Sequence, residues 1–314
     1  MKSILKRSVL SAAMMLTAIA ANAADWTPPG PIKLVIAFKA GGGVDTQARL
    51  IAEELEARHG WDVIPEQVTG KGGLNAVMDI SEQSGDGTVI TMTASNAVGY
   101  GLRSSGATSQ DVFTAITTTA GVQMGIVSKT DKGWENLDDL IAAAKAGEEI
   151  SFGAMSPMLG DLAYVIAKEK GVDFNIISMR GGKAVMNGLN AGDIDVGFLA
   201  GPQTKAVLAG EMVNLVSAMS EPLIASPEAK LLKDHGIEFT GEGFFTFLGP
   251  KNMDTEARDA IAAAIAEIVK DPETKAGALI NKVFGKPTVI AGDDLAARLS
   301  ADWDAAGALI EAAK

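Results

Sequence analysis

Short apolar runs of strand length alternate with helical patterns along most of the chain. The first run, Ile32–Phe38, is apolar at every position except Lys33, as is typical of a strand that is buried on both faces of a sheet. A glycine-rich turn follows, and then a helical pattern that begins at Asp45 or Thr46 and ends at His59-Gly60. The chain is therefore predicted to open with a strand, a tight loop and a helix.

The alternation continues through the middle of the chain. Strands are predicted at 88–93, 150–154, 174–178, 194–199 and 215–218, an apolar stretch covers 112–127, and helices are predicted at 136–147, 156–171, 182–191 and 202–209. Asn136 and Ser156-Pro157 are favourable helix starts, and Gly147 and Gly171 end the same helices. Such alternation predicts an α/β fold with mostly parallel sheets and helices on both faces.

The last third of the chain changes character at Gly241-Glu242-Gly243. An aromatic cluster, Phe244, Phe245 and Phe247, comes next, and it either packs in a hinge or stacks on a ring-bearing ligand. Helices are then predicted at 254–270 and 293–313. Because these helices bring no long sheet of their own, we expect them to return to the first part of the fold.

The simplest arrangement is two α/β lobes joined by two crossovers, since a chain of 314 residues tends to divide into two cores. We expect the first lobe to contain residues 24–124 and 243–314 and the second to contain residues 125–242. The crossovers are expected near residues 120–128 and 240–248.

The first 23 residues have the three regions of a secretory signal peptide. Lys2, Lys6 and Arg7 supply the positive start, Ser8–Ala20 is the apolar run, and Ala21-Asn22-Ala23 is a cleavage pattern. The apolar run is shorter than the roughly 20 residues that a bilayer span needs. We therefore expect an exported protein that is cleaved near Ala23.

Composition narrows the classes of function. The net charge of −12 argues against nucleic acid or an anionic membrane surface as a partner, because both require clustered lysine and arginine. Without cysteine there is no disulfide, no cysteine-bound metal and no thiol nucleophile. The two histidines, His59 and His235, each precede a glycine at a predicted helix end. Since catalytic, metal and phosphate-loop motifs are also lacking, we predict no enzyme, no metal and no cofactor.

Two glycine-rich loops are the sharpest local features. Residues 38–45 follow the first predicted strand and precede a helix, and residues 69–75 repeat this arrangement. Such a loop is either an anion cradle, in which backbone N–H groups approach the ligand, or a simple turn with Asp45 as a helix cap. Two of them at neighbouring strand ends favour ligand binding at the carboxyl edge of the sheet.

These features resemble the periplasmic solute-binding proteins of tripartite tricarboxylate transporters, the Bug family, over essentially the whole chain after residue 23. The matching segments are Pro31–Val35, Phe38–Asp45 with Ala48-Arg49-Leu50, Gly70–Gly73, Gly85–Thr88, Arg180–Gly182, Ala191–Asp195 and Asp271–Glu273. The resemblance implies a monomeric periplasmic clamshell of the type II-like class. It would capture a small organic carboxylate and deliver it to large and small integral membrane subunits. A periplasmic enzyme acting on a small carboxylate and a ligand sensor for a membrane receptor are the alternatives.

The resemblance also implies a set of ligand-binding residues. They are Gly41, Gly42, Gly43 and Asp45 in the first loop, Gly72 and Gly73 in the second, Thr93, Ser95 and Asn96 after a strand, and Ser156, Arg180 and Gly181 in the second lobe. Asp45 is expected to orient backbone, water or a ligand hydroxyl, because it would repel a carboxylate.

The departures from the family pattern also carry information. Lys39 replaces a small residue or proline, and it either adds a cation to the cleft or points to solvent. Lys183 is a further second-lobe cation beside Arg180. Phe198-Leu199-Ala200 stands where some members carry an acid that holds an amino group, which favours a ligand without a free amine.

Overall fold

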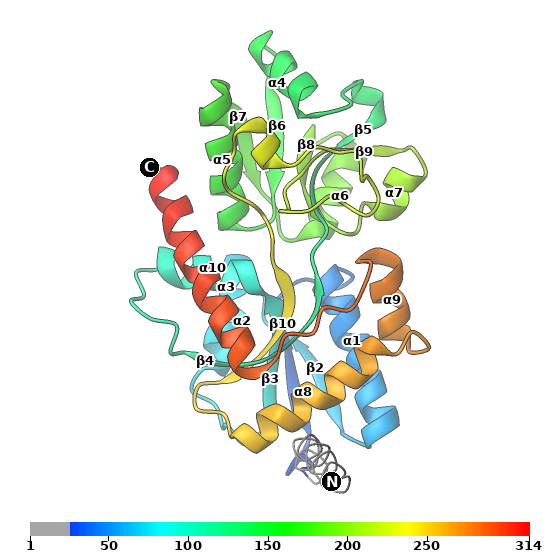
Figure 1. Ribbon diagram of the computed structural model, residues 1–314, viewed down its shortest axis with the longest axis vertical. Coiled ribbons are helices and arrows are strands. Elements are labelled where there is room, and N and C mark those ends of the chain that lie inside the picture. Colours follow the sequence, from blue (N-terminus) through cyan, green and yellow to red (C-terminus); the bar gives the residue numbers. More distant parts are fainter. Residues whose placement is uncertain (1–25) are drawn as a thin grey trace, which may run out of the picture.

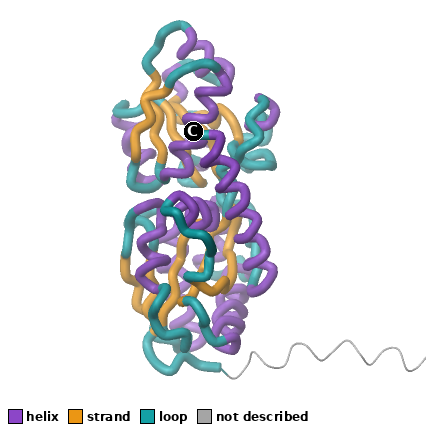
Figure 2. Tube along the Cα trace, turned by 90° about the vertical axis from the view of Figure 1, so that its left-hand side faces the viewer, coloured by secondary structure: helices purple, strands orange, loops and turns teal. Residues whose placement is uncertain are grey.

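The computed structural model describes residues 26–314, which form two α/β lobes (Figure 1). Each lobe is built on one five-stranded sheet. In a view at right angles, the two lobes stack along the long axis of the molecule (Figure 2). The predicted fold class, a two-lobed α/β clamshell, is confirmed. The predicted signal peptide, residues 1–23, lies outside the described residues.

The first lobe contains the N-terminal and C-terminal parts of the chain. Its elements are β1 (Ile32–Ile36), α1 (Gly43–His59), β2 (Val63–Gln67), η1 (Lys71–Gly73), α2 (Leu74–Ile80), β3 (Val89–Ala94), α3 (Ser95–Ser104), β4 (Phe113–Gly121), β10 (Phe244–Pro250), α8 (Thr255–Lys270), α9 (Lys275–Val283) and α10 (Gly292–Ala312). The strand order is β2-β1-β3-β10-β4.

The second lobe is formed by the middle of the chain. Its elements are β5 (Met124–Lys129), η2 (Thr130–Lys132), α4 (Leu137–Lys145), β6 (Ile150–Ala154), α5 (Pro157–Lys170), β7 (Phe174–Ser178), α6 (Gly182–Ala191), β8 (Val196–Ala200), α7 (Thr204–Leu208), β9 (Met212–Ser217) and η3 (Leu232–His235). The strand order is β7-β6-β8-β5-β9.

In each sheet four strands run in one direction and one strand is reversed. The reversed strands are β10, antiparallel to β3 and β4, and β5, antiparallel to β8 and β9. Each is the first strand after the chain changes lobe, so the reversal follows from the crossover. The two crossovers run side by side, because the Val122 N–H donates to the Gly243 carbonyl at 2.9 Å.

Alternation along β1 explains why helices cover both faces of the first sheet. Leu34 and Ile36 point into the cluster that contains Ile51 of α1, whereas Val35 packs with Ile80 of α2. All three β1 side chains are fully buried. A strand covered on both faces has few polar positions, which is why Lys33 is the one polar residue in this run.

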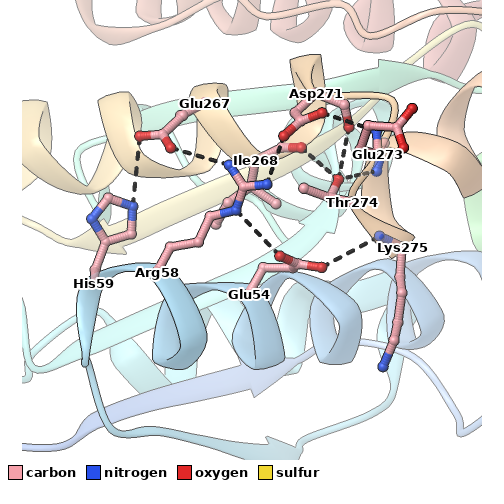
Figure 3. A network of polar contacts seen from close by, with 10 residues as sticks. Glu54, Arg58, His59, Glu267, Ile268, Asp271, Glu273, Thr274 and Lys275 are labelled. Carbon is pink, nitrogen blue, oxygen red and sulfur yellow. Dashed lines mark hydrogen bonds and ion pairs between the residues drawn. The ribbon is translucent and has the colours of Figure 1, made fainter.

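The C-terminal helices pack on elements of the first lobe. An ion-pair network fastens the α8–α9 connection to the end of α1 (Figure 3). Arg58 donates to Asp271 at 2.6 Å, to Glu267 at 3.2 Å and to Glu54 at 3.3 Å. The N–H of Glu273 and the Arg58 guanidinium together lower the pKa of the Asp271 carboxyl. The network therefore fixes the direction in which the chain leaves α8.

Three details differ from the sequence-based picture. The apolar stretch 112–127, treated as one run in the sequence, contains two strands, β4 and β5. Phe244, Phe245 and Phe247 belong to β10 rather than to the crossover itself. The helices α3 and α9 have no counterpart among the predicted elements. The two histidines do end helices, since His59 is the last residue of α1 and His235 the last of η3.

Candidate ligand-binding cleft

A cleft lies between the lobes, at the carboxyl ends of strands from both sheets. Residues that follow β1, β6 and β7 line it, as do the last residues of β3 and β8. Open α/β sheets bind ligands at this edge because the loops there change direction and leave a crevice.

The cleft has two compartments that share a common boundary. The first reaches the crossover at Val122, and the second reaches the second glycine loop. Side chains of both lobes form the boundary: Phe38, Lys39, Met155, Ser156, Arg180 and Gly181.

The first glycine loop is shaped by a buried carboxylate. Asp45 is 4% exposed, and its Oδ2 accepts the Gly41 N–H at 2.8 Å. Its Oδ1 accepts from Arg49 Nε at 2.9 Å and from Gln67 Nε2 at 3.2 Å. Gln67 Nε2 also donates to the Phe38 carbonyl at 3.0 Å. Asp45 thus orients backbone, one of the roles that the sequence suggested for it.

The second glycine loop has four successive residues with positive φ. The angles are 124° at Gly70, 48° at Lys71, 66° at Gly72 and 102° at Gly73. A β-carbon at Gly73 would stand 2.6 Å from Thr93 Oγ1, so only glycine fits there. Lysine rarely adopts a positive φ, and such backbone strain is often found at functional sites.

Helix N-termini from both lobes open into the cleft. α1 and α6 begin there, and neither has a side-chain cap at its start. α5 also begins there, and Ser156 caps it by accepting the Leu159 N–H at 3.3 Å. Free N–H groups and the helix dipole give such ends partial positive charge.

Four cationic side chains line the cleft and no aspartate or glutamate does. Lys39 and Lys71 come from the first lobe, and Arg180 and Lys183 come from the second. Within residues 26–314 none of the four forms an ion pair with a carboxylate. A chain with a net charge of −12 therefore keeps a positive cleft. Unpaired cations that face one another require a counter-charge, and an anionic ligand would supply it.

Eight of the twelve residues expected at the site line the cleft. They are Gly42, Gly43, Gly72, Gly73, Asn96, Ser156, Arg180 and Gly181. Lys39 lines both compartments.

The other four expected residues lie behind the lining. Gly41 and Asp45 bind each other within the first loop. Thr93 is fully buried behind Gly73, and its hydroxyl has no partner among the described residues. Ser95 is also fully buried, and its hydroxyl accepts the Phe244 N–H at 3.0 Å, so it supports the second crossover.

Sequence reasoning missed Lys71 and gave Lys183 less weight than its position warrants. Lys183 belongs to the second lobe, but its ammonium lies beside the first glycine loop. A β-carbon at Gly41 would be 3.1 Å from Lys183 Nζ. A lysine inside a glycine-rich loop was the available signal for Lys71. The approach of Lys183 to the first loop depends on how the lobes meet, and no local pattern encodes that.

The lobes touch on both sides of the cleft. On the side of α3 and α5 the Tyr100 hydroxyl donates to the Asp161 carboxylate, and on the side of α9 the Phe284 ring lies against Gly201 (Figure 1). Burial and the Asp161 carboxylate raise the pKa of Tyr100 above its ordinary value. The cleft is therefore bounded on two sides by direct contacts between the lobes.

A two-lobed α/β fold with a cleft at the strand ends defines the class of clamshell binding proteins. The family described as Tripartite tricarboxylate transporter family receptor matches residues 47–312, and the chain belongs to this family of solute-binding proteins. The UPF0065 protein in the gbd 5' region of Cupriavidus necator is 28% identical over 251 residues, which cover 78% of this chain and 76% of that protein.

Solved structures share the fold. The chain is similar to Rpa4515 of R. palustris with adipate, with a TM-score of 0.78, 17% identity, and coverage of 92% of this chain and 98% of that one. It is also similar to MatC of Rhodopseudomonas palustris with bound malate, with a TM-score of 0.75, 16% identity, and coverage of 92% and 100%. At these identities the likeness shows the fold alone.

Residues 26–314 contain neither a candidate membrane span nor a candidate metal site. No helix in this range combines the length and the apolar character of a membrane span. Over the same residues, no three histidine, aspartate or glutamate side chains gather in a way that would hold a metal ion.

Proposed function

We propose that this chain is a periplasmic solute-binding protein that closes over a small organic carboxylate and delivers it to a tripartite tricarboxylate-type membrane transporter. The observation that carries the proposal is the cleft with four unpaired cations and no acidic side chain. Each charge-assisted hydrogen bond to a carboxylate is worth roughly 1.5 to 3 kcal/mol. Screening limits the repulsion from the acidic remainder of the chain beyond about 8 to 10 Å.

Membership of the receptor family supports transport rather than catalysis. Two structurally similar proteins were solved with malate and with adipate, and both are organic carboxylates. The cleft lining contains neither histidine nor carboxylate, the groups most often used for acid–base catalysis. The sequence pattern of residues 1–23 supports export with cleavage near Ala23, and we propose that the mature chain acts as a monomer.

The direct test is titration calorimetry of the mature chain, residues 24–314, with mono- and dicarboxylates and with their neutral amides. At least one class of acid should bind, and the matching amides should not. The proposal fails if no acid binds, or if the amides bind as tightly as the acids.

A matched pair of variants tests the place of binding. Gly42 lines the cleft with φ at −83°, and a β-carbon there would meet only the Lys39 carbonyl oxygen, at 3.4 Å. Gly42→Leu should therefore fold and fill the cleft, with a loss of at least about a hundredfold in affinity. Gly30→Leu is the control, because a β-carbon at Gly30 would meet nothing within 4 Å. Unchanged affinity in Gly42→Leu would place the ligand elsewhere.

Delivery is tested separately, by uptake in cells that produce the large and small membrane subunits. Uptake of the bound acid should require this protein. If uptake proceeds without it while binding persists, the sensor alternative becomes the better account.

A further inference from the structure

The two compartments of the cleft differ in chemistry. The compartment that reaches the second glycine loop is lined by backbone of that loop and by Thr69, Lys71 and Ser178. The compartment that reaches the crossovers is walled mainly by apolar side chains: Val44, Ala94, Val122, Met124, Leu159, Ala200, Pro202 and Phe245. We call the compartment that these apolar side chains line the apolar compartment.

The walls of the apolar compartment are little exposed and well supported. Val122, Met124 and Leu159 are each 2% exposed, and Phe245 is 3% exposed. Phe245 is held against Phe284 with ring centroids 4.8 Å apart. Walls of this kind offer a ligand a large apolar contact surface.

The uncharged polar side chains in the apolar compartment are few, and they already form hydrogen bonds within the protein. Asn96 Nδ2 donates to the Gly241 carbonyl at 2.9 Å, and Ser156 Oγ accepts the Leu159 N–H at 3.3 Å. No acidic side chain lines it. A ligand hydroxyl or ammonium placed there would lose its hydrogen bonds to water and gain few from the protein.

The charges lie at one end of this compartment. Lys39 and Arg180 stand at the boundary between the two compartments, one from each lobe, and Lys183 lies close to the first glycine loop. A ligand anion at the boundary would contact cations from both lobes. The rest of the same ligand would then extend toward Val122 and Phe245.

From this arrangement we infer that the ligand is an organic acid with an apolar body, aromatic or aliphatic with about six carbons or more, rather than a short hydroxylated or amino acid. The inference rests on the proposed function and specifies its substrate class. The acid group occupies the boundary at Lys39 and Arg180, and the body occupies the apolar compartment. Closure of the lobes completes that compartment, because Val44 and Phe245 of the first lobe and Leu159 and Pro202 of the second all line it.

The test is a calorimetric series on the mature chain with butyrate, hexanoate, octanoate, benzoate, 3-phenylpropionate, succinate and malate. Affinity should rise about fourfold for each methylene that is buried, until the compartment is full. Hexanoate and 3-phenylpropionate should bind more tightly than succinate and malate.

A second arm uses an isosteric variant. Val122→Thr keeps the shape of the wall and adds a hydroxyl, so it should weaken octanoate binding about tenfold and leave butyrate nearly unchanged. Val127→Thr is the matched control, because Val127 is fully buried on β5 and packs with α6 away from the cleft.

The outcomes separate the two proposals. If malate or succinate binds more tightly than hexanoate, the inferred substrate class is wrong and the binding function stands. If no acid binds at all, the binding function fails and the inference fails with it. Equal effects of Val122→Thr and Val127→Thr would also overturn the inference, because the apolar wall would then not touch the ligand.

Discussion

Asp45 lies beneath the first glycine loop, and both of its oxygens are used within the protein. Its negative charge therefore points away from the cleft and toward Gly41, Arg49 and Gln67. A carboxylate can in this way serve an anion-binding loop, because it fixes the backbone while its charge is already neutralised by donors.

Replacing Asp45 should affect both stability and binding. We expect Asp45→Ala to lower the free energy of unfolding by about 2 to 3 kcal/mol, since it removes charge-assisted bonds in a buried place. It should also weaken carboxylate binding, because the Gly41 N–H loses its partner. Chemical denaturation and calorimetry measure the two effects.

The control for Asp45 is Asp79, which pairs with Lys33 at 3.4 Å on the surface. Asp79→Ala should cost no more than about 1 kcal/mol and leave binding unchanged. If the two variants behave alike, the first loop does not depend on its buried carboxylate.

At the scale of elements, α5 begins at the cleft and its first turn has two tasks. Ser156 caps the helix, and the same side chain lines both compartments. In α4, Asn136 caps the helix with bonds to Asp138 and Asp139 and is not among the residues that line the cleft. The two caps therefore form a natural pair for comparison.

Removal of either cap should cost about 1 kcal/mol of unfolding free energy. Only Ser156→Ala should also weaken ligand binding, by several-fold, because it removes a hydroxyl from the lining. Asn136→Ala should bind as the unmodified protein does. Loss of affinity in Asn136→Ala, or none in Ser156→Ala, would show that the hydroxyl acts only as a helix cap.

Elements were predictable wherever the chain alternates between apolar runs and capped helices, as in β6 and α5. The division between β4 and β5 was not, because the crossover residue Val122 is itself 2% exposed and thus apolar. Hydrophobicity marks burial, and here the connection between the lobes is as buried as the strands that it joins. The sequence also did not predict which strands β10 pairs with, since strand order depends on contacts between distant segments.

The same limit applies to the candidate site. The glycine loops are local features, and the sequence predicted both where they lie and that each connects a strand to a helix. Lys71 lines the cleft because of the conformation of its loop, and Lys183 lies near Gly41 because of how the two lobes pack together. Ser95 was expected in the lining because it directly follows a strand, but its hydroxyl faces the backbone of β10 instead.

At the scale of the whole molecule, the contact between Tyr100 and Asp161 joins α3 to α5 across the lobes. Burial and Asp161 hold the pKa of Tyr100 above its ordinary value, so the hydroxyl stays protonated and able to donate. The stabilisation is complete below the ordinary tyrosine pKa of about 10 and is lost only as pH rises through the raised value. The contact should therefore be insensitive to pH from about 5 to 9.

Loss of this contact should favour separation of the lobes. Tyr100→Phe removes about 1 kcal/mol of interlobe hydrogen bonding, which is about a fivefold shift toward an open form. Small-angle X-ray scattering without ligand should show a larger radius of gyration than in the unmodified protein. Tyr164→Phe is the control, since Tyr164 is 43% exposed on α5. Equal radii for the two variants would mean that the contact does not hold the lobes.

The position of β10 in the first sheet also determines the order in which the lobes are completed. All five strands of the second lobe lie within residues 124–217, whereas the first sheet needs β10, residues 244–250, between β3 and β4. Whenever the chain emerges with its N-terminus first, the second lobe acquires its full set of strands first. The first lobe, although it contains the start of the chain, keeps β4 apart from β3 until the last quarter of the protein has begun to emerge.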